Sequence, residues 1–324
     1  MKLLVTGGAG YIGSTVTTLL IDAGHEVTVL DDLSSGRESS VPDGATFVPG
    51  RVQDRADDIL AAGGFDGVLH LAGYIEVGES MFKPEAFWAN NVGGTMRLLD
   101  AMRAHGVGRL VFSSTGTVHG NTKQMPITET AELAPLNPYA ATKLSVDLML
   151  TGYCAAWGLA ATSLRYFNAA GALLRPGGKS CGELHDPESH LIPIVLSVAA
   201  GERETLPLYG DDYDTPDGTC VRDYIHVADL ATAHLLALEA ARPGVHRIYN
   251  LGNGKGFSNL EVIQVVREVT GRPVPVKLEP RRLGDIVAQV ASSAKAQADL
   301  GWKPTRPSLH EIVADAWTFR QENA

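Results

Sequence analysis

Two side chains near the middle of the chain have the types and the spacing of a proton-transfer pair. Tyr139 and Lys143 occur in the run NPYAATK, residues 137–143. Residues four apart share one face of a helix, so the lysine ammonium is expected to favour the phenolate and lower the pKa of the phenol. Such a phenol would exchange protons with a hydroxyl group at neutral pH. The same spacing also arises on ordinary solvated helices, so its meaning depends on the rest of the chain.

The first residues have the pattern of a phosphate-binding turn between a strand and a helix. The apolar run Met1–Val5 predicts a buried strand, and the apolar periodicity of Tyr11–Ala23 predicts a helix. Between them, Gly7 allows a tight turn, Gly10 lets a phosphate approach the backbone, and Gly13 lets the helix pack closely on the strand. This G-x-x-G-x-x-G spacing predicts a nucleotide phosphate at the helix N-terminus.

A carboxylate after the second predicted strand indicates which dinucleotide binds. The run Glu26–Leu30 reads as a strand, and Asp31 follows it, eighteen residues after Gly13. A carboxylate in that place can accept hydrogen bonds from both ribose hydroxyls of an adenosine. It would repel a 2′-phosphate, so the sequence predicts NAD rather than NADP as the cofactor.

Length and composition exclude several classes of protein. With 324 residues, of which 44% are hydrophobic, the chain can bury one large core or two closely joined domains. It has no run of about 18 apolar residues, so no membrane association is expected. The formal charge of −10, without a basic stripe, argues against nucleic acid as a partner.

Cysteine usage bears on compartment and metal content. Cys154, Cys181 and Cys220 cannot all pair with one another and form no C-x-x-C motif. This pattern argues against structural zinc and suits a reducing compartment, so a cytoplasmic protein without a metal site is predicted.

Apolar runs typical of strands alternate with helical patterns at residues 46–48, 67–72, 109–114 and 161–167. The alternation predicts an α/β fold: a Rossmann-type doubly wound parallel sheet with a smaller, sequence-interleaved C-terminal substrate domain. Segments 169–190 and 210–219 are polar and rich in turn residues and are expected to form a cleft, whereas the apolar run 246–251 is expected to return to the sheet. We expect an NAD-binding domain at 1–168 plus about 223–252, and a substrate domain at about 169–222 and 253–324.

Several motifs together resemble the extended short-chain dehydrogenase/reductase family, and within it the UDP-glucose 4-epimerases. They occur in this order from residue 1 to about residue 317: GGAGYIG at 7–13, VGES at 77–80, SST at 113–115, the Tyr139 and Lys143 pair, RYFN at 165–168, YDTPDGT at 213–219 and RDYIHV at 222–227. The resemblance implies a UDP-sugar as substrate, so the substrate domain is expected to bind UDP-sugars. Because the motifs are collinear, chance spacing of Tyr139 and Lys143 is a poor explanation.

The resemblance implies NAD-dependent inversion at carbon 4 of a UDP-hexose, through a transient 4-keto sugar. Tyr139 would remove the proton from the 4-hydroxyl while hydride leaves carbon 4, and Thr115 would hydrogen-bond that hydroxyl. Lys143 would hold the nicotinamide ribose and lower the pKa of Tyr139. Return of the hydride to the other face of the sugar inverts the carbon, so NAD remains bound throughout.

The resemblance also implies the binding residues. For the cofactor these are Gly7, Gly10, Tyr11, Ile12, Gly13, Asp31, Asp32, Leu33, Ser35, Gly36, Val52, Leu71, Ala72, Gly73, Asn90, Ser113, Tyr139, Lys143 and Tyr166. For the substrate they are Thr115, Tyr139, Asn168, His190, Leu191, Tyr209, Arg222, Arg282 and Asp285. The two arginines are assigned to the diphosphate, for which their forked donors are suited, and Asp285 to the uridine ribose.

The residues after Thr115 argue against elimination chemistry. Related sugar-nucleotide 4,6-dehydratases carry an acidic pair there, and related decarboxylases carry a glutamate. This chain has Gly116 and Thr117, and no glutamate stands between Ser113 and Gly120. Oxidation and return at carbon 4 therefore remains the favoured reaction.

Some positions depart from the family pattern and leave the sugar open. Relatives usually have lysine at Ile75, aspartate at Arg51, tyrosine at His119, asparagine at His190 and serine at Thr115, and Gln289 occupies a position that limits the size of the sugar pocket. Arg175, Lys179, His185 and His190 offer cations to a sugar carboxylate, so a UDP-glucuronate 4-epimerase is an alternative, and UDP-N-acetylglucosamine also remains possible.

Two further expectations concern the class of protein and its assembly. A non-catalytic NAD-binding sensor would have no need for Thr115, Tyr139 and Lys143 together, so an enzyme is favoured. A homodimer is expected by analogy, with helices around 91–105 and 139–157 pairing across a two-fold axis. Leu144, Leu148 and Met149 could contribute to that contact or face the sheet.

Overall fold

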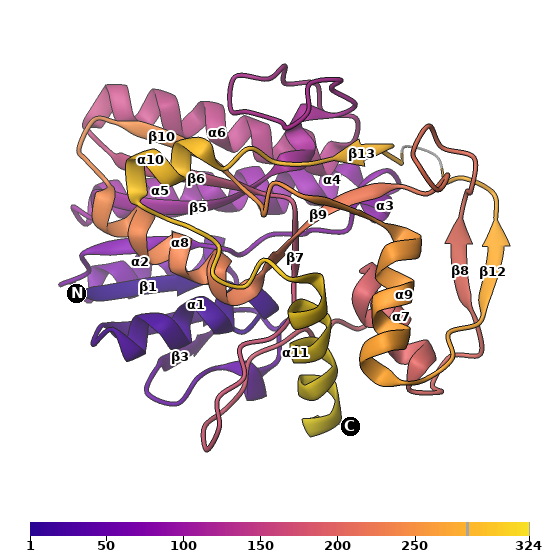
Figure 1. Ribbon diagram of the computed structural model, residues 1–324. Helices are drawn as coiled ribbons and strands as arrows, with labels where there is room; N and C mark the ends of the chain where they lie inside the picture. Colours follow the sequence, from indigo (N-terminus) through magenta and orange to yellow (C-terminus); the bar gives the residue numbers. More distant parts are fainter. Residues whose placement is uncertain (283–284, 324) are drawn as a thin grey trace.

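A parallel sheet of seven strands forms the centre of the larger part of the molecule (Figure 1). The computed structural model describes residues 1–282 and 285–323. In the order in which they pair, the strands are β10 (His246–Leu251), β6 (Ala160–Tyr166), β5 (Arg109–Thr115), β4 (Gly67–His70), β1 (Lys2–Thr6), β2 (Glu26–Asp31) and β3 (Thr46–Pro49). The strand order reverses between β1 and β4, and in open α/β sheets a ligand binds at such a reversal, beyond the carboxyl ends of the strands.

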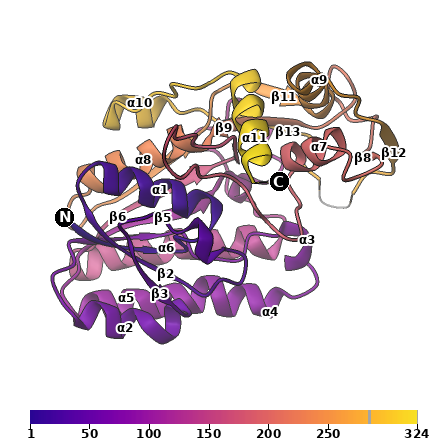
Figure 2. The same cartoon turned by 90° about the horizontal axis from the view of Figure 1, so that it is seen from below.

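Helices cover both faces of this sheet (Figure 2). One face packs against α1 (Tyr11–Asp22) and α8 (Val227–Ala240), and the other against α2 (Val52–Ala61), α5 (Gly94–Ala104) and α6 (Pro138–Trp157). Successive strand residues alternate between the two cores: Leu3 and Val5 join the α1 and α8 side, whereas Leu4 joins the other. Burial on both faces explains why the strands read as continuous apolar runs.

Several short helices and helical turns connect these strands and helices. They are α3 (Val77–Ser80), α4 (Pro84–Phe87), a π-helical turn η2 (Trp88–Gly93) leading into α5, the 3₁₀ turns η1 (Glu38–Ser40) and η3 (Gly116–His119), and α10 (Ala294–Leu300) beside β10.

A second, smaller region lies at the carboxyl edge of the sheet (Figure 1). Its strands are β7 (Asn168–Ala170), β9 (Val221–His226), β11 (Gly256–Ser258) and β13 (Ala288–Gln289) in one sheet, and the parallel pair β8 (Leu206–Tyr209) and β12 (Val276–Glu279). Its helices are α7 (Leu191–Ala199), α9 (Asn259–Thr270) and α11 (Leu309–Glu322). Ile192, Val266 and Ile312 from these helices meet in a separate core, so this region has its own hydrophobic support.

The predicted fold is confirmed. The expected strands are present, with ends shifted by one or two residues: the run 67–72 ends as a strand at His70, and 161–167 spans Ala160–Tyr166. Segment 210–219 contains no helix or strand, and β10 returns to the large sheet as expected. The division into two domains stays a proposal. The pairing of β9 with β7, β11 and β13 favours a boundary after His226 rather than before Asp223.

The sequence predicts no membrane association, and the length and hydropathy of the helices bear on this prediction. Among residues 1–282 and 285–323, no helix is both long enough and apolar enough to cross a bilayer.

A buried ion pair fastens α6 to the middle of the large sheet. The Arg165 guanidinium on β6 contacts Asp147 Oδ2 on α6 through Nη2 at 2.8 Å and Nε at 2.9 Å, and both side chains are only 2% exposed. Ser114 Oγ on β5 donates to the same carboxylate oxygen at 3.2 Å. One carboxylate therefore ties together the strand end that carries Thr115 and the helix that carries Tyr139.

Neutralising this carboxylate should destabilise the protein strongly. Asp147→Asn leaves the Arg165 guanidinium buried without a counter-charge, which typically costs about 3–5 kcal/mol. We expect a large fall in the urea midpoint of unfolding. The double variant Asp147→Asn/Arg165→Gln should lose less than the sum of the two single variants, because neither charge is then left alone.

A surface pair supplies the control. Lys83 Nζ and Glu79 Oε1 are 2.8 Å apart on an exposed turn, and Glu79→Gln should change stability by less than about 1 kcal/mol. Equal effects of Asp147→Asn and Glu79→Gln would contradict a structural role for the buried pair.

Candidate active site

Two adjoining cavities lie where the large sheet meets the smaller region. One, of about 310 Å³, lies over the carboxyl ends of the central strands and is lined by the glycine loop and by Tyr139. The other, of about 660 Å³, is lined mainly by the smaller region. Asn168, Ala169, Glu183 and His190 line both, so the two cavities share a wall.

The glycine loop is built as a dinucleotide phosphate site requires. Gly7 has φ +75°, and a Cβ there would lie 2.5 Å from the Ala72 nitrogen; a Cβ at Gly13 would lie 2.0 Å from the Gly7 oxygen. Side chains at either place would force the strand, loop and helix apart. A Cβ at Gly10 would meet only the Gly7 oxygen, at 3.4 Å. Gly10 lines the cavity and immediately precedes α1. The loop therefore fits a phosphate of NAD.

Asp31 ends β2 at the edge of the smaller cavity. Its carboxylate accepts hydrogen bonds from Ala9 N at 3.0 Å and Leu33 N at 2.9 Å. Burial raises the pKa of Asp31 above its ordinary value, and the two backbone donors oppose that rise. These bonds hold the carboxylate in the cavity wall, where it fits the adenosine ribose of NAD.

Helix α6 begins so that the proton-transfer pair faces the sheet. Asn137 Oδ1 accepts from Ala140 N at 2.9 Å, and Pro138 occupies the first helical turn, both of which favour a helix start. Tyr139 and Lys143 then lie one turn apart, and both line the smaller cavity. The π-helical turn supports this arrangement, because Asn91 Nδ2 donates to Thr142 Oγ1 at 3.1 Å.

The predicted lowering of the Tyr139 pKa by Lys143 is wrong for this structure, in which the Tyr139 pKa is raised. Burial raises the pKa of Tyr139, and a hydrogen bond with Thr115 opposes this only in part. Lys143 Nζ instead donates to the Ser113 carbonyl oxygen at 2.9 Å and lies 4.9 Å from the centroid of the Phe112 ring. Burial also lowers the pKa of Lys143 to about 8, so this ammonium loses its proton more readily than a lysine in water. Helical spacing predicted correctly that the two residues lie together, but it could not predict how deeply they are buried.

Thr115 lies at the end of β5, in a position to contact Tyr139. Its Oγ1 accepts a hydrogen bond from Thr117 N at 3.2 Å and lies 2.9 Å from Thr117 Oγ1. Thr117 also lines the cavity and was not predicted. A Cβ at Gly116 would lie 2.6 Å from the Phe167 ring, so this backbone leaves no room for an acidic side chain there. The absence of an elimination acid at Gly116 thus has a steric basis.

The larger cavity contains the residues expected to bind the nucleotide. Asn168, His190, Leu191, Tyr209, Arg222, Arg282 and Asp285 all line it. The Arg282 guanidinium lies 4.7 Å from the centroid of the Tyr209 ring, and its Nε is 3.2 Å from Asp285 Oδ2. Arg222 Nη1 donates to its neighbour's carbonyl oxygen, that of Val221, at 2.9 Å.

The structure separates the two neighbouring arginines. Arg281 Nε is 2.5 Å from Asp212 Oδ1, and its guanidinium stacks 4.2 Å from the centroid of the Tyr213 ring. Arg282 alone of the two lines the larger cavity. Leu283 and Gly284, which stand between Arg282 and Asp285, lie outside the described residues.

Most of the predicted cofactor residues also line the smaller cavity. These are Gly7, Gly10, Tyr11, Ile12, Gly13, Asp31, Asp32, Ser35, Val52, Leu71, Ala72, Gly73, Asn90, Tyr139, Lys143 and Tyr166. The other three lie behind the cavity wall. Leu33 N donates a hydrogen bond to Asp31, and the Ser113 carbonyl oxygen accepts one from Lys143. A Cβ at Gly36 would lie 2.8 Å from the Ala9 backbone. Their roles in binding stay predictions.

The departures from the family pattern fall into two groups. Arg51 and Ile75 line the smaller cavity. His119 and Gln289 are buried, and His119 Nδ1 lies 3.1 Å from the Glu132 oxygen. In the described part of the chain, the Nε2 atoms of both buried side chains lack a hydrogen-bond partner.

The cations proposed for a sugar carboxylate are already paired. Arg175 Nη2 is 2.9 Å from Asp22 Oδ1, and Lys179 Nζ donates to the Val41 oxygen at 2.7 Å. His185 Nδ1 is 2.9 Å from Glu183 Oε1. These contacts weaken the argument for UDP-glucuronate, because Arg175 and Lys179 are paired with other parts of the chain and line neither of the two cavities.

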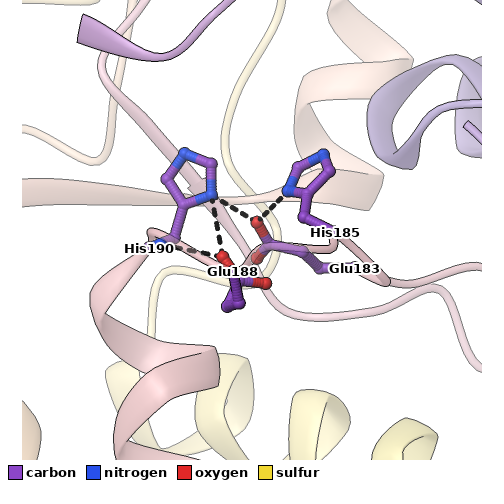
Figure 3. A group of neighbouring side chains, drawn as sticks. All are labelled: Glu183, His185, Glu188 and His190. Atoms are coloured by element: carbon purple, nitrogen blue, oxygen red, sulfur yellow. Dashed lines mark hydrogen bonds and ion pairs between the residues drawn. The ribbon is translucent and has the colours of Figure 1, made fainter. Parts of the chain in front are cut away.

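Glu183 lines both cavities and was missed in the sequence. It lies among His185, Glu188 and His190 (Figure 3). Burial disfavours a charged His190, but its contact with Glu183 outweighs this and raises the pKa of His190 to about 10. The regular Glu-x-His-x-x-Glu-x-His spacing of residues 183–190 was the available signal.

Comparisons with known proteins agree with this geometry. The model of the NAD dependent epimerase/dehydratase family matches residues 3–252. The UDP-glucose 4-epimerase of Corynebacterium glutamicum is 53% identical over 98% of this chain and 95% of that protein. The UDP-glucose 4-epimerase of Streptomyces lividans is 54% identical over 99% of this chain and 97% of that protein.

A solved structure is similar over the whole chain. The UDP-glucose 4-epimerase of Bifidobacterium longum, in complex with NAD+ and UDP, has a TM-score of 0.93 and 37% identity, and the match covers 100% of this chain and 99% of that one. The predictions of NAD as the cofactor and of an epimerase are confirmed by these findings. The chain belongs to the NAD dependent epimerase/dehydratase family.

Proposed function

We propose that the protein inverts carbon 4 of a UDP-hexose and interconverts UDP-glucose and UDP-galactose. The observation that carries this proposal is the meeting of Thr115, Tyr139 and Lys143 in a cavity that begins at the glycine loop and adjoins one lined by Arg222 and Arg282. The proton-transfer group, the dinucleotide loop and the phosphate-binding cations thus occupy one continuous region.

The residues of this chain supply proton transfer and orientation. Tyr139 takes the proton of the 4-hydroxyl as that carbon is oxidised and gives it back on reduction, and Thr115, which lines the same cavity, orients that hydroxyl. The glycine loop and Asp31 would hold NAD, which would supply hydride acceptance and return, and its positive charge would favour the Tyr139 phenolate that burial disfavours. Lys143 holds the nicotinamide ribose.

The larger cavity anchors the part of the substrate that does not react. Arg222 and Arg282 bind the diphosphate, Asp285 and Tyr209 bind the uridine, and Asn168 reaches the sugar from the shared wall. Inversion requires the keto sugar to present both faces to the cofactor, and anchoring at the nucleotide allows the sugar to turn without leaving the site.

The sugar is the finer part of this proposal. The similarity to UDP-glucose 4-epimerases over nearly the whole chain and the internal pairing of Arg175 and Lys179 favour UDP-glucose over UDP-glucuronate. A sensor without catalysis is disfavoured by the joint presence of Thr115, Tyr139 and Lys143 in one cavity.

Incubation with single substrates tests the proposal. The enzyme is given one substrate at a time, without added NAD: UDP-glucose, UDP-N-acetylglucosamine or UDP-glucuronate. Chromatography of the sugar nucleotides should show conversion of UDP-glucose only. Inversion of UDP-glucuronate in preference to UDP-glucose would overturn the assignment of the sugar.

Tyr139→Phe tests the proposed base: it should lower the rate by about 10²–10⁴-fold, the usual contribution of a positioned proton-transfer group. An unchanged rate would rule out Tyr139 as the base.

Lys143 gives a stability signature that is independent of activity. Its pKa is about 8 in the folded protein and 10.5 in an unperturbed lysine. Above the lower value, the unfolded chain keeps a proton that the folded chain has released, so folding stability rises with pH up to the higher value. Relative to Lys143→Met, the wild type should gain about 2 kcal/mol in free energy of unfolding between pH 7 and about 9.5, measured by urea titration.

The control for this measurement is another lysine. Lys303 is exposed, and Lys303→Met should leave the pH dependence of the wild type in place. A constant difference between wild type and Lys143→Met across the range would mean that burial does not lower the Lys143 pKa.

We propose a homodimer as the working assembly and the cytoplasm as its compartment. Leu148 on α6 is 65% exposed, and Met96 on α5 is 45% exposed, which supports a contact through these helices. Met149 instead packs against the core of the large sheet. The three cysteines are buried and unpaired, which suits a reducing compartment and can be checked by cell fractionation.

A charge on the exposed face of α6 should break the dimer. Leu148→Glu is expected to shift the mass measured by light scattering from that of two chains to that of one, because two glutamates would meet near the two-fold axis. Leu278→Glu, at an exposed leucine on β12, should leave the mass unchanged. A monomeric wild type would refute the proposed assembly.

A further inference from the structure

Two glutamates and two histidines converge on one point in the wall between the cavities (Figure 3). They are Glu183, His185, Glu188 and His190, and one ligand atom from each lies within 4.8 Å of all the others. Both imidazoles turn Nδ1 toward the carboxylates: His185 Nδ1 is 2.9 Å and His190 Nδ1 is 2.5 Å from Glu183 Oε1. His190 Nδ1 is also 3.4 Å from Glu188 Oε1.

The two carboxylates of this cluster would be stabilised by a bound cation. The side chains of Glu183 and Glu188 are only 7% and 16% exposed, and among the described residues neither pairs with a lysine or an arginine. Two nearly buried carboxylates that share one site repel each other and lose hydration. A proton on His190 balances one of the two carboxylates, whereas a divalent ion would take the place of that proton and balance both.

We propose that Glu183, His185, Glu188 and His190 bind one divalent transition-metal ion, with Zn²⁺ as the occupant. Two imidazole nitrogens and two carboxylate oxygens form a ligand set that zinc accepts, at about 2.0–2.2 Å from the metal. Tetrahedral ligands at that distance are about 3.3 Å apart. Three of the separations are 2.5–3.4 Å and all lie within 4.8 Å, so adjustments of up to about 1.5 Å would bring the four ligands around an ion.

The donor types choose among the metals. Magnesium and calcium prefer sites made only of oxygen ligands, whereas imidazole suits zinc and its neighbours in the first transition row. The prediction of no metal site from the sequence rested on the cysteines, which says nothing about sites made from histidine and glutamate.

The place of the cluster gives the ion a structural task. Segment 171–190 is almost without regular structure, with a single bridge between Leu173 and Cys181. At its start, the Tyr11 hydroxyl of the glycine-loop helix donates to the Gly171 oxygen at 2.7 Å, and near its end the His185 ring lies edge-on to Tyr11 at 6.5 Å. An ion at the cluster would hold this segment against the cofactor loop and fix the wall that the two cavities share.

Metal content of the full chain tests the site. The protein, free of any histidine tag, is treated with a chelator, dialysed against Zn²⁺ and then against metal-free buffer, and its zinc is counted by mass spectrometry. We expect about one Zn²⁺ per chain, and a melting temperature that rises with Zn²⁺ and falls again with chelator. Because no substrate is involved, this result is independent of the sugar chemistry proposed above.

Paired variants separate this site from chance binding. His185→Gln/Glu188→Gln removes one ligand of each type and should lose the bound zinc and its effect on melting. The surface pair His310 and Glu268, whose Nε2 and Oε2 atoms are 2.7 Å apart, supplies the control: His310→Gln/Glu268→Gln should bind zinc as the wild type does. Zinc content of the wild type no higher than that of the first variant, or equal loss in both variants, would overturn the proposal.

Cobalt substitution keeps the test decisive if the ligand variant does not fold. Co²⁺ bound to wild type should show the intense visible absorption of a four-coordinate ion, in contrast to the weak spectrum of the hydrated ion. A spectrum identical to that of Co²⁺ in buffer would mean that no such site forms.

Discussion

The buried contact between Asp147 and Arg165 is the constraint on which the catalytic geometry depends. A helix and two strands that are distant in sequence meet at one carboxylate oxygen, which also accepts a hydrogen bond from Ser114. Because both charges are almost completely buried, neither can separate from the other without a large desolvation penalty. The helix bearing Tyr139 therefore cannot slide along the strand end bearing Thr115.

Burial also decides the electrostatics of the reacting groups. In the dry cavity the phenol of Tyr139 holds its proton more firmly and Lys143 holds its proton less firmly than either would in water. Burial is the cause of both shifts. A bound cofactor with positive charge would oppose the effect of burial on the Tyr139 phenol.

The shared wall between the cavities links recognition to chemistry. Asn168 follows the last residues of β6, and Glu183 and His190 come from the irregular segment that crosses the glycine loop. A single displacement of this segment would alter both cavities together. Tyr11 and the Glu183 cluster are the contacts that hold this segment beside the glycine loop.

The sequence by itself determined the parallel sheet, the glycine loop, the carboxylate of Asp31 and the spacing of Tyr139 and Lys143, because each depends on local periodicity or on a short motif. Only the tertiary structure decided which neighbour each cation meets: Arg281 pairs with Asp212, Arg282 lines the cavity, and Arg175 and Lys179 are engaged elsewhere. It also decided the direction in which the Tyr139 pKa shifts. Burial and long-range pairing arise from residues far apart in the chain, and no local pattern specifies their desolvation.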